Sequence, residues 1–179
     1  RLFGVKARVV VPEKANVGKV AAMKGMGAEA IMHGANFDEA RQHCEELARE
    51  HNYRYIHSGD EPLLIAGVGT GTLEIMEDEA NIEVIIVPIG GGSGAAGACI
   101  VARAINPTIR VIGVQAEGAP AAYQSWKNRR MMTAPNQTFA EGLATGSGFE
   151  LPQEILRKHL DDFLLVSDRE IAQAMVWLI

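Results

Sequence analysis

Cysteine is almost absent from this chain, and so are the signals of several protein classes. Only Cys44 and Cys99 occur among 179 residues, and they lack the spacing of a disulfide framework or a zinc site. We therefore expect two buried thiols that behave as small hydrophobic groups. The chain also contains no apolar run of 18 residues and no signal peptide, which favours a cytoplasmic protein without membrane contact.

Clustered positive charge is missing as well. The 17 lysines and arginines are outnumbered by 22 aspartates and glutamates, for a net charge of -5, so we expect no nucleic-acid partner. The histidines show no metal-ligand spacing, and we expect them to be structural or solvated: His33, His43, His51, His57 and His159. His57 is of most interest, because it ends a predicted strand.

Strands and helices alternate along the chain, and 47% of its residues are hydrophobic. The patterns predict strands at 6–12, 28–33, 53–58, 83–89, 109–115 and 163–167, and helices at 17–26, 37–51, 62–76 and 94–105. This order predicts an α/β fold with parallel sheets flanked by helices. The turn residues Ser58-Gly59-Asp60 suggest two lobes, residues 1–58 and 59–179.

The most informative stretch is "IEVIIVPIGGGSGAAGACIVARAI", residues 82–105. A strand that ends in a glycine-rich loop and feeds a helix directs successive backbone N–H groups at one point, where the helix dipole favours an anion. Glycine lets the backbone approach phosphate oxygens, and the Ser93 hydroxyl adds a donor. The alternative is a tight crossover that needs small residues only for packing.

The kind of phosphate ligand is open at this point. No lysine follows Gly94, which excludes a Walker A loop. A dinucleotide fingerprint can be placed on residues 92–97, with Glu117 near the expected acidic position. A second glycine-rich stretch, residues 67–72, lies inside a helical pattern, and we interpret it as close helix packing.

"VPIGGGSGAAG", with "IAGVGTGTLEI" before it and "NPTIRVIGVQAEGAPAAYQSW" after it, resembles the serine/threonine dehydratase (threonine ammonia-lyase) branch of the fold type II pyridoxal-phosphate enzymes. The likeness covers essentially the whole chain. It implies a tryptophan-synthase-β-like fold, with residues 1–58 in the small cofactor-facing lobe and 59–179 in the large phosphate-binding lobe. It also implies pyridoxal 5′-phosphate as cofactor, with a homo-oligomer, a dimer in the first instance.

The resemblance further implies which residues bind the cofactor. Its 5′-phosphate would be held by Gly90, Gly91, Gly92, Ser93 and Gly94, and Glu141-Gly142 would lie beside its pyridine ring. Such an enzyme also needs a lysine to form a Schiff base. Lys127 stands in a Ser-x-Lys-x-Arg string, but it follows the glycine loop, whereas the family lysine precedes it.

We therefore expect the catalytic lysine outside this chain, in a longer protein of which this is an internal segment. Ser167 and Glu170 form a predicted capping box that opens a last helix, and no C-cap residue follows it. The segment alone is expected to be inactive.

Some relatives bind a divalent cation where this chain has Gln115 and Ala121, with Glu117 nearby on the surface, so no metal is predicted. Asp161-Asp162 is interpreted as a solvated turn.

For the complete protein, these features favour deamination of threonine or serine, by β-elimination of the hydroxyl, to a 2-oxo acid and ammonia. Alternatives are a related racemase, a β-replacing synthase, or a truncated, non-catalytic lobe that binds a phosphate or nucleotide.

Overall fold

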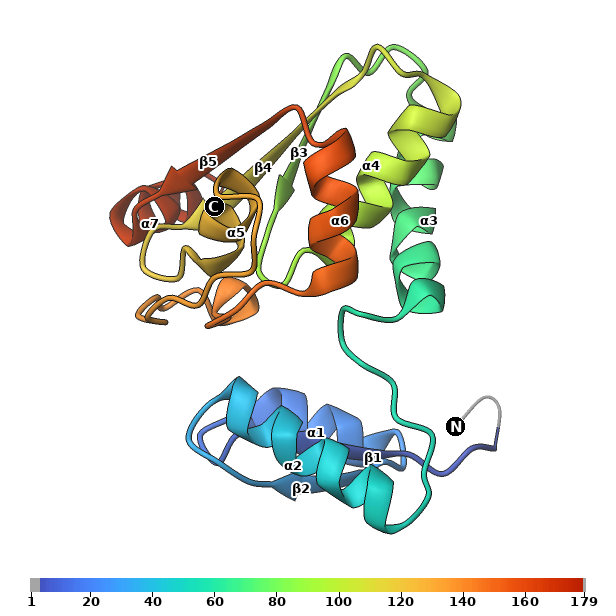
Figure 1. Cartoon of the computed structure of the whole chain (residues 1–179), viewed down its shortest axis with the longest axis vertical. Coiled ribbons are helices and arrows are strands. Elements are labelled where there is room, and N and C mark those ends of the chain that lie inside the picture. Colours follow the sequence, from blue (N-terminus) through green and yellow to red (C-terminus); the bar gives the residue numbers. More distant parts are fainter. Residues whose placement is uncertain (1–3, 179) are drawn as a thin grey trace. The chain divides into compact units, whose positions relative to one another are not determined.

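The computed structural model describes residues 4–178, and these divide into two compact units. The first unit ends at Ile56 and the second begins at His57, two residues before the division predicted from the sequence. Figure 1 shows the helices and strands of both units, which are described one at a time below.

The first unit is a two-stranded parallel sheet with two helices. Strand β1 (Arg8–Val11) pairs with β2 (Glu29–Met32). Helix α1 (Val17–Gly25) links them, and α2 (Phe37–Glu50) follows. Both helices begin at an asparagine whose side chain accepts backbone N–H groups of the first turn, as expected of N-caps: Asn16 for α1 and Asn36 for α2.

The third strand predicted for this region, residues 53–58, is wrong. In the part of the chain that the structure describes, β1 and β2 form a sheet of two strands, and residues 53–57 join no ladder. Tyr53 and Ile56 are exposed. Their β-branched and aromatic composition fits a strand, but strand propensity mostly reflects packing against neighbours, and here no neighbouring strand is provided.

The second unit contains a three-stranded parallel sheet of order β3-β4-β5. Its strands are β3 (Val84–Pro88), β4 (Arg110–Ala116) and β5 (Asp162–Val166). Its helices are α3 (Pro62–Asp78), α4 (Ser93–Ile105), α5 (Ala121–Lys127), α6 (Glu150–His159) and α7 (Asp168–Trp177), with a short 3-10 turn at Glu141–Leu143. The predicted alternation is thus confirmed in this unit, as is the capping box that Ser167 and Glu170 form at α7.

The core of the second unit lies between one face of this sheet and helices α4 and α6. Val111 of β4 and Phe163 of β5 are buried there with Cys99 of α4 and Leu156 of α6.

Cys99 therefore behaves as predicted, and burial raises the pKa of its thiol to about 12. Cys44 in α2 is only half-buried, so the prediction of two buried thiols is wrong for that residue.

Helices α3 and α4 pack through glycine. A Cβ atom added to Gly97 would lie 2.8 Å from the backbone nitrogen of Gly69 and 3.0 Å from its Cα. The two backbones are therefore close enough to exclude even a methyl group. This contact confirms close helix packing for Gly69, whereas a Cβ at Gly67 or Gly71 in the same stretch would meet no atom within 4 Å.

Asp161 is exposed, as the sequence suggested, but its carboxylate also has specific partners. Its Oδ2 atom accepts hydrogen bonds from Arg103 Nη2 at 2.6 Å and from the backbone N–H of Val111 at 2.7 Å. Arg103 also donates to the carbonyl oxygens of Pro107, Ile109 and His159. The pair thus joins the end of α4 to the starts of β4 and β5.

Among residues 4–178, no helix combines the length and apolar character needed to cross a membrane.

Candidate functional site

The glycine loop connects β3 to α4 in the second unit. Ile89 is fully buried at the end of the strand, and Gly92 is the N-cap of α4 with a φ of 104°, a value that favours glycine. The first helical hydrogen bond runs from Ala96 N to Gly92 O. The N–H groups of Ser93, Gly94 and Ala95 therefore precede the hydrogen-bond ladder of the helix, at its positive end.

The loop has a packed side and an open side. A Cβ at Gly91 would lie 1.9 Å from the Phe149 ring, and one at Gly92 would lie 3.2 Å from side-chain atoms of Leu156 and Pro152. A Cβ at Gly94, in contrast, would meet no atom within 4 Å. Glycine at position 91 is thus required by a neighbouring ring, whatever else binds there, whereas Gly94 borders open space.

The predicted ring-side pair, Glu141-Gly142, lies beside this loop. A Cβ at Gly90 would be 3.0 Å from the Gly142 carbonyl oxygen and 3.3 Å from Leu143 Cα. Gly142 itself is exposed, and a Cβ there would meet nothing within 4 Å. The structure therefore brings together the two groups of residues predicted to bind the cofactor, although some fifty positions separate them in the sequence.

The segment before Glu141 is fastened to the carboxyl ends of two strands. Gln137 N donates to Gly118 O, after β4, at 2.7 Å. The Thr138 hydroxyl donates to Asp168 Oδ1, after β5, at 2.6 Å, and Phe139 N donates to the second oxygen of the same carboxylate at 3.1 Å. Because Gly90, after β3, lies beside Gly142, residues 137–143 contact residues that follow all three strands. Ligands of open parallel sheets bind at this edge.

Phe149 and His57 were not predicted to lie near the glycine loop. The Phe149 ring would be 2.0 Å from a Cβ at Gly59 and 1.9 Å from one at Gly91, so it lies between these two glycines. His57 meets the ring edge to face at a centroid distance of 4.8 Å, and its Nδ1 accepts from the N–H groups of Gly59 and Asp60. His57 therefore has a structural role here. The sequence signal was the isolated Gly59, but nothing in the sequence identified its partner.

Lys127, the lysine of the Ser-x-Lys-x-Arg string, has no described contact with the glycine loop. Lys127 is exposed at the last turn of α5, and its Nζ donates to the Tyr123 hydroxyl at 3.2 Å. An exposed ammonium group is not desolvated, which is the usual way in which a catalytic lysine is activated. The structure thus agrees with the prediction that Lys127 is not the Schiff-base residue.

The positions considered for a metal carry no negative charge. Gln115 and Ala121 are both fully buried, and Glu117 is exposed, as predicted. Within residues 4–178, no group of three or more histidine, cysteine, aspartate or glutamate side chains is arranged to hold a metal ion.

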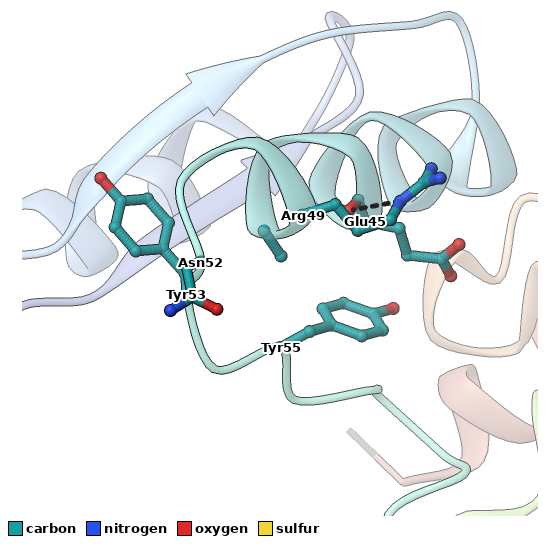
Figure 2. Close-up of a pocket in the computed structure, with 6 residues that line it drawn as sticks. Glu45, Arg49, Asn52, Tyr53 and Tyr55 are labelled. Carbon is teal, nitrogen blue, oxygen red and sulfur yellow. Dashed lines mark hydrogen bonds between the residues drawn. The ribbon is translucent and has the colours of Figure 1, made fainter.

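A separate surface pocket of about 450 Å³ lies in the first unit, along the end of α2 (Figure 2). It is lined by Glu45, Ala48, Arg49, Asn52, Tyr53 and Tyr55. Burial, followed by the charge of Glu45, raises the pKa of the Tyr55 hydroxyl to about 12. The phenol is therefore neutral near pH 7 and is not activated as a base or nucleophile. The pocket contains none of the residues predicted to bind a cofactor.

The glycine loop fits a phosphate monoester. It offers N–H groups at a helix N-terminus, the Ser93 hydroxyl and an open side at Gly94, and no carboxylate of the loop itself opposes an anion. Glycine loops that lead into a helix at the carboxyl edge of an open parallel sheet are a common arrangement for binding phosphate groups. The model of the pyridoxal-phosphate dependent enzyme family matches residues 1–179, and this chain belongs to that family, whose members use pyridoxal phosphate.

Several relatives make the relationship more specific. The chain is 39% identical over 176 residues to "L-threonine dehydratase catabolic TdcB" of Staphylococcus aureus strain N315, covering 98% of this chain and 51% of the relative. Among solved structures, maize serine racemase superposes with a TM-score of 0.90 at 32% identity, covering 98% of this chain and 53% of that one. Serine racemase from Dictyostelium discoideum gives a TM-score of 0.85 at 35% identity, covering 97% and 56%. The fold type II architecture is thereby confirmed, and the chain spans about half the length of these relatives.

Proposed function

We propose that this chain forms part of a pyridoxal-phosphate enzyme that deaminates threonine or serine. Removal of the Cα proton and loss of the β-hydroxyl would convert the amino acid to a 2-oxo acid and ammonia. The observation that carries the proposal is the glycine loop, with its open helix N-terminus, in a chain 39% identical to a protein named as a threonine dehydratase. On the resemblance to this family we also propose a small amino-acid substrate and a homo-oligomer, and we propose a cytoplasmic location.

In this proposal the residues of the second unit bind and orient the cofactor. Gly90, Gly91, Gly92, Ser93 and Gly94 hold the 5′-phosphate, and Glu141-Gly142 lies beside the pyridine ring. The cofactor, when bound, supplies the electron sink that stabilises a carbanion at Cα. The lobe that residues 1–58 form would face the cofactor, and the Schiff-base lysine would come from a part of the protein outside this chain.

A racemase is the second candidate, because two structural relatives at 32% and 35% identity are serine racemases. Racemisation, elimination and β-replacement share removal of the same Cα proton, so the residues described here serve each of them equally. The purified full-length protein should be given L-threonine, L-serine and D-serine separately. Release of ammonia and 2-oxo acid supports the dehydratase, whereas interconversion of the serine enantiomers without ammonia overturns it in favour of the racemase.

Gly94 is the residue at which phosphate binding is best tested. Gly91 is unsuitable, because any side chain there would collide with Phe149 and confuse loss of binding with misfolding. Gly94→Asp places a carboxylate at the open side of the loop, where it would repel the phosphate, and should weaken pyridoxal-phosphate binding at least about tenfold. Gly94→Ala, which adds a methyl group to open space, is the matched control.

Binding should be measured by titration calorimetry with pyridoxal phosphate, alongside the melting temperature of each variant. Weak binding by Gly94→Asp, with Gly94→Ala close to the parent chain, supports the phosphate site. Equal affinity of all three proteins would remove the loop from the binding site and leave the non-catalytic alternative without its ligand.

A further inference from the structure

Gln115 is a buried polar side chain directly below the glycine loop. It lies near the end of β4, on the sheet face that α4 and α6 cover, and it is 0% exposed. A side chain of this kind must find hydrogen-bond partners inside the protein, because leaving its amide unpaired carries a desolvation penalty. Both ends of the Gln115 amide have such partners, and each partner belongs to a different segment.

The orientation of the amide follows from one of these partners. Tyr123 N, in the first turn of α5, donates to Gln115 Oε1 at 2.9 Å. A backbone N–H can only donate, so the oxygen of the amide must face Tyr123 and its nitrogen must face the other way. On that other side, Gln115 Nε2 donates to the carbonyl oxygen of Gly90 at 3.4 Å.

The first contact replaces a missing helix cap. The N-cap residue of α5 is Pro120, which makes no side-chain capping bond. Gln115 accepts one of the N–H groups left open at this helix start. The side chain is therefore held firmly at one end, which fixes the position of its other end.

The second contact acts on the glycine loop. The Gly90 carbonyl and the Gly91 N–H belong to one planar trans peptide unit and point in opposite directions. Holding the Gly90 oxygen toward Gln115 therefore turns the Gly91 N–H away from it. Glycine has little conformational preference of its own, so a run of three glycines needs an external contact to select one peptide orientation.

We propose that Gln115 is the positioning residue of the glycine loop, setting its peptide orientation for an anionic ligand without touching that ligand. The role rests on the proposed function, in which this loop binds the cofactor phosphate. The neutral amide serves both partners at once, because it accepts through its oxygen and donates through its nitrogen. An ionised carboxylate can accept from Tyr123, but it has no proton to donate to the Gly90 carbonyl and would repel that oxygen.

The proposal is tested with two variants of Gln115 in the purified chain. Gln115→Glu has the same shape, and Gln115→Met has a similar length without hydrogen bonds. Gln124→Glu in α5, which adds the same charge at a partly exposed position, is the control. The probes are pyridoxal phosphate and inorganic phosphate, with dissociation constants from calorimetry at about pH 8 and about pH 5, each relative to the parent chain at the same pH. Circular dichroism verifies folding.

The pH dependence separates positioning from simple packing. At about pH 8, Gln115→Glu and Gln115→Met should both bind about tenfold more weakly than the parent chain. At about pH 5, burial helps the new glutamate to hold a proton, which it can donate to Gly90. Its affinity should then recover to within about threefold of the parent, whereas that of Gln115→Met should not.

The outcomes distinguish this role from the proposed function. If the parent chain and the control bind neither probe, the phosphate site itself fails. If the parent chain binds but the Gln115→Glu defect is absent or does not change with pH, the positioning role is wrong and the phosphate site stands. A variant that fails to fold leaves the other to decide: Gln115→Met with parent-like affinity overturns the role, and Gln115→Glu recovering at low pH supports it.

Discussion

The two units of this chain bury their side chains to very different degrees. Among the described residues of the first, the buried hydrophobic ones are Val11 and Val20, each 8% exposed, and Ala40 at 1%. In the second, Val111, Cys99 and Leu156 are all 0% exposed and belong to a continuous cluster. A two-stranded sheet with two helices has little surface with which to enclose a core.

The candidate site lies in the unit that buries its side chains more completely. The glycine loop and the Glu141-Gly142 segment both belong to the well-packed unit, where Phe149, Leu156 and Gln115 support the loop from inside. A phosphate site depends on the accurate placement of N–H groups, which a dense core provides. The first unit carries an open surface pocket, and most of its described positions are exposed. The following predictions break or sharpen this contrast.

The largest effect is expected from Leu156. Leu156→Ala would leave a cavity in a fully packed region under Gly92 and should lower the free energy of unfolding of the second unit by about 3 kcal/mol. The matched change in the first unit, Val20→Ala, should cost about 1 kcal/mol. Hydrogen exchange followed separately for the two units measures both. Equal losses of protection in the two units would show that they unfold together. The difference in burial would then not correspond to a difference in stability.

An intermediate effect is expected where α3 meets α4. Gly97→Ala forces a methyl group against the backbone of Gly69 and should destabilise the second unit by about 2 kcal/mol. Gly71→Ala in the same pair of helices adds its methyl group to open space and should stabilise α3 by about 0.5–1 kcal/mol. Thermal unfolding of the two variants should therefore shift in opposite directions. Shifts of the same sign would mean that the helices can separate freely.

The smallest effect concerns acid. Burial raises the pKa of Asp161, but the Val111 N–H and the Arg103 guanidinium outweigh it, so the folded pKa lies below its ordinary value. Such a carboxylate stabilises the fold above its unfolded pKa of about 3.9, and the contribution is lost as the pH falls through the lower, folded pKa. Asp161→Asn should therefore flatten the acid limb of the stability curve of the second unit. Acid unfolding followed by circular dichroism measures that limb, and a limb as steep as that of the parent chain would contradict the prediction.

Much of the fold could be predicted because its signals are local. Apolar periodicity located α2 and α4, a Ser-x-x-Glu pattern located the cap of α7, and a β-branched run located β3. Each depends on residues within a few positions of one another. The strand predicted at 53–58 failed for the opposite reason, because a strand exists only where another strand offers hydrogen bonds, and no local pattern records that.

The candidate site divides in the same way. Its glycines were found from their spacing after a strand, since an anion-binding loop is a continuous segment. Its support was not found, because Phe149, Asp168 and Gln115 act on residues 25 to 90 positions distant. The ion pair of Asp161 was missed for the same reason, because its partner Arg103 is 58 positions away.

By itself, the sequence determined the order of the elements, the class of the fold and the position of the glycine loop that we propose binds an anion. Those features depend on periodicity, on turn residues and on the small size of glycine. Only the tertiary structure decided why each glycine is needed: Gly91 for the Phe149 ring, Gly97 for the backbone of α3, and Gly94 for open space. A glycine looks the same in the sequence whether a ring, a backbone or open space lies next to it. Its neighbours come from distant parts of the chain, so only folding shows which of these it is.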